Sequence, residues 1–134
     1  MATGYFTHSA CRRHDMGEGH PECPQRLSTI DDHLLAQGLD ALLLHSEPPE
    51  ATVDQLDRAH DRNYVLGLID RLQQLQASGE QRYCDPDTLA MPPTLQAALR
   101  AAGASGSAPH ARLPRPMGNA FFALRPTPRT APPP

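Results

Sequence analysis

Residues 14–26, which read HDMGEGHPECPQR, form the densest run of chemically capable side chains in this chain. Imidazole, thiol, carboxylate and guanidinium groups are the ones that bind metals, transfer protons or hold anions. The run has no hydrophobic periodicity. Gly17 and Gly19 permit backbone turns that are closed to other residues, while Pro21 and Pro24 prevent a helix from running through. The sequence therefore predicts a stiff polar loop, the kind of segment on which binding groups are often placed.

A small zinc module is one interpretation of this loop, because Cys11, His14, His20 and Cys23 are residue types that ligate zinc. Structural zinc sites normally use tightly spaced ligand pairs, and the two prolines restrict how the loop can wrap around a metal. Polar loop residues with a half-buried thiol are the alternative. Cysteine is present at only one further position, Cys84, without CxxC spacing, which favours free thiols in a reducing compartment.

Further motifs accompany the loop in a fixed order: YFTH at residues 5–8, H-x-x-G-x-x-H-P-E-x-P-x-R at 14–26, RAHDRNYV at 58–65, CDPDT at 84–88, AALRAAGA at 97–104 and GNAFFALRP at 118–126. As a set they resemble the N-terminal portion of the histone deacetylase superfamily, which includes the bacterial class II-type, acetoin-utilisation and acetylpolyamine deacetylases. The resemblance covers residues 3–104 and 118–126. It implies an α/β fold, specifically the N-terminal fragment of an arginase/deacetylase-like three-layer fold with a parallel sheet.

The complete family hydrolyses acetyl-lysine or acetylpolyamine amides with zinc, which polarises the acetyl carbonyl and its bound water while a histidine takes the proton. In the family, Pro-Gly-His-His follows the Arg-Pro of GNAFFALRP, and the Asp, His and Asp that hold zinc lie further along. This chain reads TPRTAPPP after Pro126. We therefore expect a truncated member that has no catalytic residue, binds no zinc and is inactive alone. The composition around residues 118–126 suggests reading-frame slips in the gene.

The resemblance also assigns residues to the substrate path. Arg26 takes the place of an arginine beside the internal channel that releases acetate, where a guanidinium fork can hold a carboxylate. Two entrance loops border the substrate, one with His20, Pro21 and Glu22 and the other with Asp85 and Asp87. The alternatives are a solvated arginine, satisfied loop histidines and an exposed turn. His60 and Asp61 suggest a catalytic pair, but adjacent residues at a helix start point in different directions, and in the family they are scaffold.

The elements expected to position these groups are a first strand over residues 3–8 and a series of helices. One helix is predicted over residues 24–38 with Leu27, Ile30, Leu34 and Leu35 on one face, and another begins at Thr52 as its N-cap and buries Val53, Leu56 and Ala59. The strongest helical signal covers residues 61–77, where Asp61 can cap and apolar residues recur at three- and four-residue intervals: Tyr64, Val65, Leu68, Ile69, Leu72 and Leu75. A last helix is predicted over residues 94–102 with Gly103 as its stop. Residues 39–45 read as a short buried strand or a helix end. Residues 1–104 are expected to form the domain part, followed by a Pro-rich irregular tail over 105–134 that contains a family strand at 118–126.

Composition sets limits on partners and location. The 134 residues include 15 prolines and no Trp, with 39% hydrophobic residues and a net charge of −3. Without a basic stripe, nonspecific nucleic-acid binding is not expected. No segment reads as a signal peptide or a membrane span, so we expect a cytoplasmic protein.

Exposed apolar surface is a further expectation, because a fragment with two parallel strands would leave their edges uncovered. Self-association is one consequence. A non-catalytic interaction fragment is another, in which exposed helix faces and a polyproline tail at Pro126, Pro128 and residues 132–134 bind a partner.

Overall fold

The computed structural model describes residues 2–107 and 117–125. Its main sheet has three strands in the order β2-β1-β5. Strand β1 (Ala2–Phe6) lies in the centre and pairs in parallel with β2 (Leu43–Ser46) and with β5 (Met117–Phe122). Parallel neighbours need long crossover connections, which here contain the helices. The predicted α/β fold with a parallel sheet is confirmed, but the expectation of two strands was too low.

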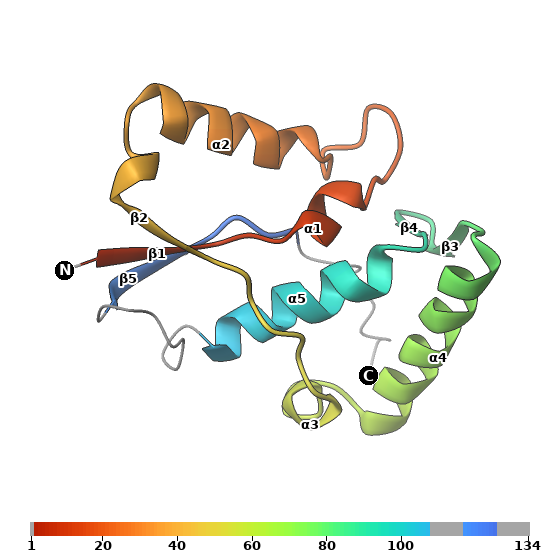
Figure 1. Ribbon diagram of the computed structural model, residues 1–134. Helices are drawn as coiled ribbons and strands as arrows, with labels where there is room; N and C mark the ends of the chain where they lie inside the picture. The colour runs from red at the N-terminus through yellow and green to blue at the C-terminus, as the bar shows by residue number, and fades with distance from the viewer. Residues whose placement is uncertain (1, 108–116, 126–134) are drawn as a thin grey trace.

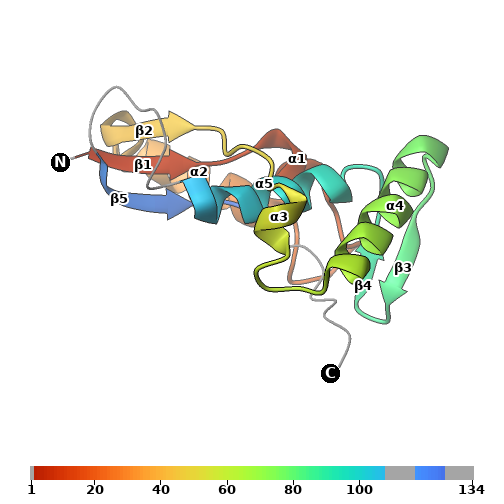
Figure 2. The same ribbon diagram turned by 90° about the horizontal axis from the view of Figure 1, so that it is seen from below.

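Two helices cover the sheet from opposite sides. Helix α2 (Gln25–Ala36) lies on one side, and α5 (Thr94–Ser107) lies on the other (Figures 1 and 2). Their contacts with β1, the segment after it and the end of β5 form the first core cluster, which consists of Tyr5, Ala10, Cys11, Leu27, Ala97 and Ala123. Ile30 and Leu34 pack against it as predicted, whereas Leu35 is exposed. Three layers therefore result, as the family resemblance implied.

The segments around β2 combine predicted and unpredicted turns of helix. Helix α1 (Ser9–Arg13) was not predicted; His8 caps it, with Nδ1 accepting from the Ala10 amide at 3.1 Å. Helix α2 ends before residues 39–45, so of the two alternatives for these residues the strand is present, as β2, after the 3-10 turn η1 (Asp40–Leu42). The predicted burial was wrong, because β2 is only partly buried and Leu42 is 71% exposed.

Helix α3 (Val53–Leu56) begins with the Thr52 cap that the sequence predicted. Thr52 and Gln55 form a reciprocal capping box, in which each side chain accepts from the other residue's amide. Val53 and Leu56 are partly buried, but Ala59 is exposed because the helix ends at Leu56. The predicted burial of Ala59 was therefore wrong.

A second core cluster lies between α4, α5 and a small hairpin. Helix α4 (Arg62–Ser78) starts at the predicted cap Asp61, which accepts from the Tyr64 amide at 3.0 Å. The antiparallel strands β3 (Arg82–Asp85) and β4 (Thr88–Ala90) form the hairpin, which the sequence pattern had not revealed. The fully buried members of the cluster are Leu72, Leu75, Ala90 and Leu95. The hairpin and α4 stand at the side of the sheet that faces away from the N-terminus (Figure 1).

Helix α5 runs beyond the stop predicted at Gly103 and ends at Ser107. Gly103 is buried inside the helix, where a Cβ atom would overlap the Pro49 carbonyl and touch the Ala51 amide. The Ala51 amide donates to the Leu99 carbonyl at 2.9 Å, so the two segments lie very close. Gly103 therefore serves close packing. Part of the segment predicted to be irregular is helical at 105–107 and extended at Met117; residues 108–116 and 126–134 lie outside the described residues.

Candidate functional site

The loop of residues 14–24 lies against the C-terminal end of the parallel sheet. It follows β1 and α1 in sequence, and it contacts the segment that continues β5, where the Ala123 amide extends the ladder by donating to the Phe6 carbonyl at 2.9 Å. Open parallel α/β sheets bind ligands outside the carboxyl ends of their strands. This loop is therefore the candidate functional site.

Arg125 lies under the loop, and its side chain is only 1% exposed. Its guanidinium donates to two backbone carbonyls of the loop, those of His14 and Glu22. Its Nε lies 3.8 Å from Oε2 of Glu22. Burial lowers the pKa of Arg125, and the Glu22 carboxylate opposes that shift. A buried charge needs such partners.

Sequence reasoning included Arg125 only as part of the strand motif and missed its role. The available signal was a charged residue placed immediately after the apolar run FFAL, where an arginine must either reach solvent or find buried acceptors. The structure shows the second outcome.

His14 fastens the start of the loop to helix α5. Its ring is 1% exposed, and Nδ1 lies 2.9 Å from the Thr94 hydroxyl, which also accepts from the Met91 amide at 2.9 Å. Burial lowers the pKa of His14 to about 4, and the Arg125 charge contributes to the shift. The imidazole is therefore neutral at ordinary pH and acts as a satisfied structural group, which was one of the alternatives for this residue.

The two predicted entrance loops meet in the structure. Nε2 of His20 lies 3.5 Å from Oδ1 of Asp87, whose side chain is 94% exposed. On its other side, Nδ1 of His20 accepts from the Glu22 amide at 3.0 Å. Arg26 donates to the Glu22 carboxylate at 2.8 Å and is half exposed.

Pro21 and Asp85 are the other two predicted entrance residues. Pro21 is exposed between His20 and Glu22. Asp85 ends strand β3, but its side chain lies outside the described residues. The structure thus brings His20, Glu22, Arg26 and Asp87 to one rim.

The proposed zinc ligands of the loop are not brought together. Cys11 is buried, with its thiol 3.9 Å from the Ala97 carbonyl and a pKa raised by burial, whereas His14 is engaged by Thr94. Across the described ranges, no three His, Cys, Asp or Glu side chains form a set that could hold a metal ion. The loop is therefore not supported as a metal module, and the zinc implied by the resemblance has no fitting ligands there.

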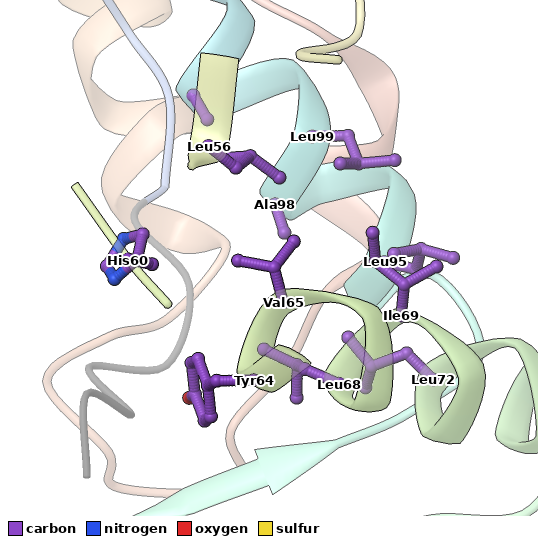
Figure 3. A pocket seen from close by; sticks show the side chains of 11 residues that line it. Leu56, His60, Tyr64, Val65, Leu68, Ile69, Leu72, Leu95, Ala98 and Leu99 are labelled. Carbon is purple, nitrogen blue, oxygen red and sulfur yellow. The ribbon is translucent and has the colours of Figure 1, made fainter. Parts of the chain in front are cut away.

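A separate apolar groove of about 150 Å³ lies between α4 and α5. Leucine, isoleucine, valine and alanine side chains dominate its lining, and His60 and Tyr64 lie together at one end (Figure 3). Asp61 is occupied as the helix cap, and the His60 ring lies near the Tyr64 ring with centroids 6.4 Å apart. The groove therefore offers apolar surface, and His60 with Asp61 forms no catalytic pair.

Comparisons with known proteins show the family of this chain through a family model and its fold through a solved structure. Residues 20–128 match the family described as "Histone deacetylase domain". The chain is similar to the solved structure described as "Crystal Structure of HDA15 HD domain", with a TM-score of 0.74 and 24% identity over 93% of this chain and 35% of that one. No curated protein matches the sequence. Within the described part of the chain, no helix is long and apolar enough to cross a bilayer.

Proposed function

Because the chain belongs to the histone deacetylase domain family, we propose that it forms the N-terminal part of a deacetylase domain and builds one rim of the substrate entrance. The chain spans about a third of the length of the solved domain that it resembles, since it covers 35% of that chain. The observation that carries the proposal is the contact between the two loops, in which His20 reaches Asp87 next to the end of the parallel sheet.

The chemistry of this rim suits an acetylated amine, either acetyl-lysine or an acetylpolyamine. The Asp87 side chain is 94% exposed, so an ammonium group or backbone amides of a substrate can approach its carboxylate from solvent. Arg26 is half exposed and keeps donors that can hold acetate beside the channel. The bacterial acetoin-utilisation or acetylpolyamine type, and a reducing cytoplasmic location that suits three free cysteines, are parts of the same proposal.

The proposal for residues 1–134 does not include catalysis, because the reaction of the family uses zinc. Since no metal-holding set of side chains exists within residues 2–107 and 117–125, we assign no step of the reaction to these residues. A polypeptide of residues 1–134 should therefore contribute binding surface without amide hydrolysis.

Resequencing the coding DNA from the Gly103 codon onward, with translation in all three frames, tests the family role. The proposal predicts a frame that encodes Pro-Pro-Gly-His-His after the Arg125 codon, followed by an Asp-x-His zinc motif. If no frame encodes these motifs, the deacetylase role fails and a non-catalytic role remains.

Self-association is the second candidate, and exposed aromatic residues on β5 favour it. Phe121 and Phe122 are 47% and 40% exposed, and within the described residues no strand pairs with the outer edge of β5. Such an uncharged edge is a template for another strand. Sedimentation velocity should show a concentration-dependent dimer that Phe122→Lys abolishes. A monomer at all concentrations, for the unsubstituted chain, contradicts this candidate.

A further inference from the structure

We propose that Arg125 is a positioning residue that sets the place of Arg26 through the shared carboxylate of Glu22. The inference rests on the proposed role of the loop as an entrance rim. Arg125 itself is buried beneath the loop and is remote from solvent, while Arg26 lies on the rim and is half exposed. The Glu22 carboxylate lies between the two guanidinium groups and so connects the buried Arg125 to the exposed Arg26.

The first link is the fork of Arg125. It donates to carbonyls at the two ends of the loop, those of His14 and Glu22, and so closes residues 15–21 into a fixed arc. Other hydrogen bonds of the arc are mostly local, such as the Gly17 amide to Asp15 Oδ1 at 3.0 Å. A planar guanidinium can reach two acceptors at once in a fixed geometry, whereas a lysine ammonium lacks that fork.

The second link is the Glu22 side chain. Oε1 accepts from Arg26 at 2.8 Å, and Oε2 lies 3.8 Å from Nε of Arg125. Both Oε2 and that Nε are buried without a hydrogen-bond partner. Two positive groups therefore flank one carboxylate, and the buried one, Arg125, loses a charge partner if that carboxylate moves away.

Substitutions of Arg125 and of Glu22 should therefore have different effects on the loop. Removing the fork at Arg125 should release the loop backbone and Arg26 together. Removing only the charge of Glu22 should release Arg26, while the carbonyl bonds keep the backbone in place. An arginine that merely fills space in the core would not produce this division.

Amide hydrogen exchange by mass spectrometry tests the first link on the full chain. Arg125→Met should raise exchange in residues 15–23 by at least about tenfold while peptides from α4 stay protected. Arg125→Lys should restore part of the protection. Arg100→Met is the matched control, because Arg100 also donates to a backbone carbonyl, that of Pro48, at 2.7 Å, but far from the loop.

Each outcome of that experiment decides the first link. Unchanged exchange of residues 15–23 in Arg125→Met overturns it. If Arg125→Met unfolds the whole chain, the Lys variant decides: a loop as protected as in the unsubstituted chain overturns the link, and selective loosening supports it.

Nitrogen-15 NMR of the Arg26 guanidinium tests the second link. Rotation about the Nε–Cζ bond of Arg26 should become faster in Glu22→Gln, while amide hydrogen exchange in residues 15–21 stays unchanged. The rotation should also become faster in Arg125→Met and in Arg125→Lys. Unchanged Arg26 rotation in Glu22→Gln overturns the relay. None of these readouts depends on deacetylation, so failure of the relay and failure of the proposed function are distinguishable.

Discussion

Acid should destabilise this protein through His14. Its pKa is lowered from 6.5 to about 4, first by burial and then by the Arg125 charge. The unfolded chain takes up this proton near pH 6.5, but the folded chain resists it until about pH 4. The contribution of neutral His14 to stability is therefore complete above pH 6.5 and is lost as the pH falls toward 4.

The size of the effect follows from the two pKa values. Each tenfold difference in proton affinity corresponds to about 1.4 kcal/mol, so complete titration should remove about 3 kcal/mol of unfolding free energy. Most of that loss, about 2 kcal/mol, falls between pH 7 and pH 4.5. Because the ring is 1% exposed, solvent screening does not reduce this figure much.

Urea unfolding followed by circular dichroism at pH 7 and pH 4.5 measures the loss. His14→Gln removes the titrating ring but keeps an amide that can bond the Thr94 hydroxyl. This variant should lose about 2 kcal/mol less than the unsubstituted chain over the same pH interval. His60→Gln, at an exposed position, is the control and should behave as the unsubstituted chain. Equal losses in His14→Gln and the unsubstituted chain would refute the reasoning.

Two further predictions concern packing. Gly103→Ala should cost about 1–3 kcal/mol because the added methyl group overlaps the Pro49 carbonyl, whereas Gly67→Ala, in an exposed helical position with nothing within 4 Å, should stabilise by about 0.5–1 kcal/mol. Thermal melts of the two variants check this contrast, and shifts of the same sign contradict it. Leu72→Ala, in the second core cluster, should cost about 3 kcal/mol in urea unfolding. A loss below about 1 kcal/mol would mean that the α4 to hairpin contact is not a packed core.

The helices that carry local signals could be predicted from the sequence. Asp61 caps α4 and Thr52 caps α3 as expected, because a cap involves only the first turn of its own helix. The stripe of apolar residues in α4 likewise placed Leu72 and Leu75 in the core. These features depend on neighbours three or four residues away.

Features that depend on distant contacts could not be predicted in this way. Gly103 reads as a helix stop in isolation, but its role is decided by the backbone of Pro49 and Ala51. Arg125 is separated by 111 residues from the carbonyl of His14 that it holds. Its place under the loop is a property of the folded sheet, not of a short motif.

Within the candidate site, the resemblance selected the loops of residues 20–22 and 85–87, and the structure shows how these loops are arranged. Nε2 of His20 and Oδ1 of Asp87 lie 3.5 Å apart in the structure. The two residues are far apart in the sequence, so their contact could not be predicted from it. The alternative of a small zinc module, which the loop's spacing and prolines disfavoured, finds no support, because the Cys11 thiol lies against the Ala97 carbonyl and the His14 ring against the Thr94 hydroxyl.

Acetate release by the purified polypeptide of residues 1–134 tests the central claim most directly, with an acetyl-lysine peptide and an acetylpolyamine as substrates and with or without equimolar zinc. Our proposal that residues 1–134 contribute binding surface without hydrolysis predicts no release above the protein-free rate under either condition. Zinc-dependent release that rises with protein concentration and stops on chelation would contradict the account.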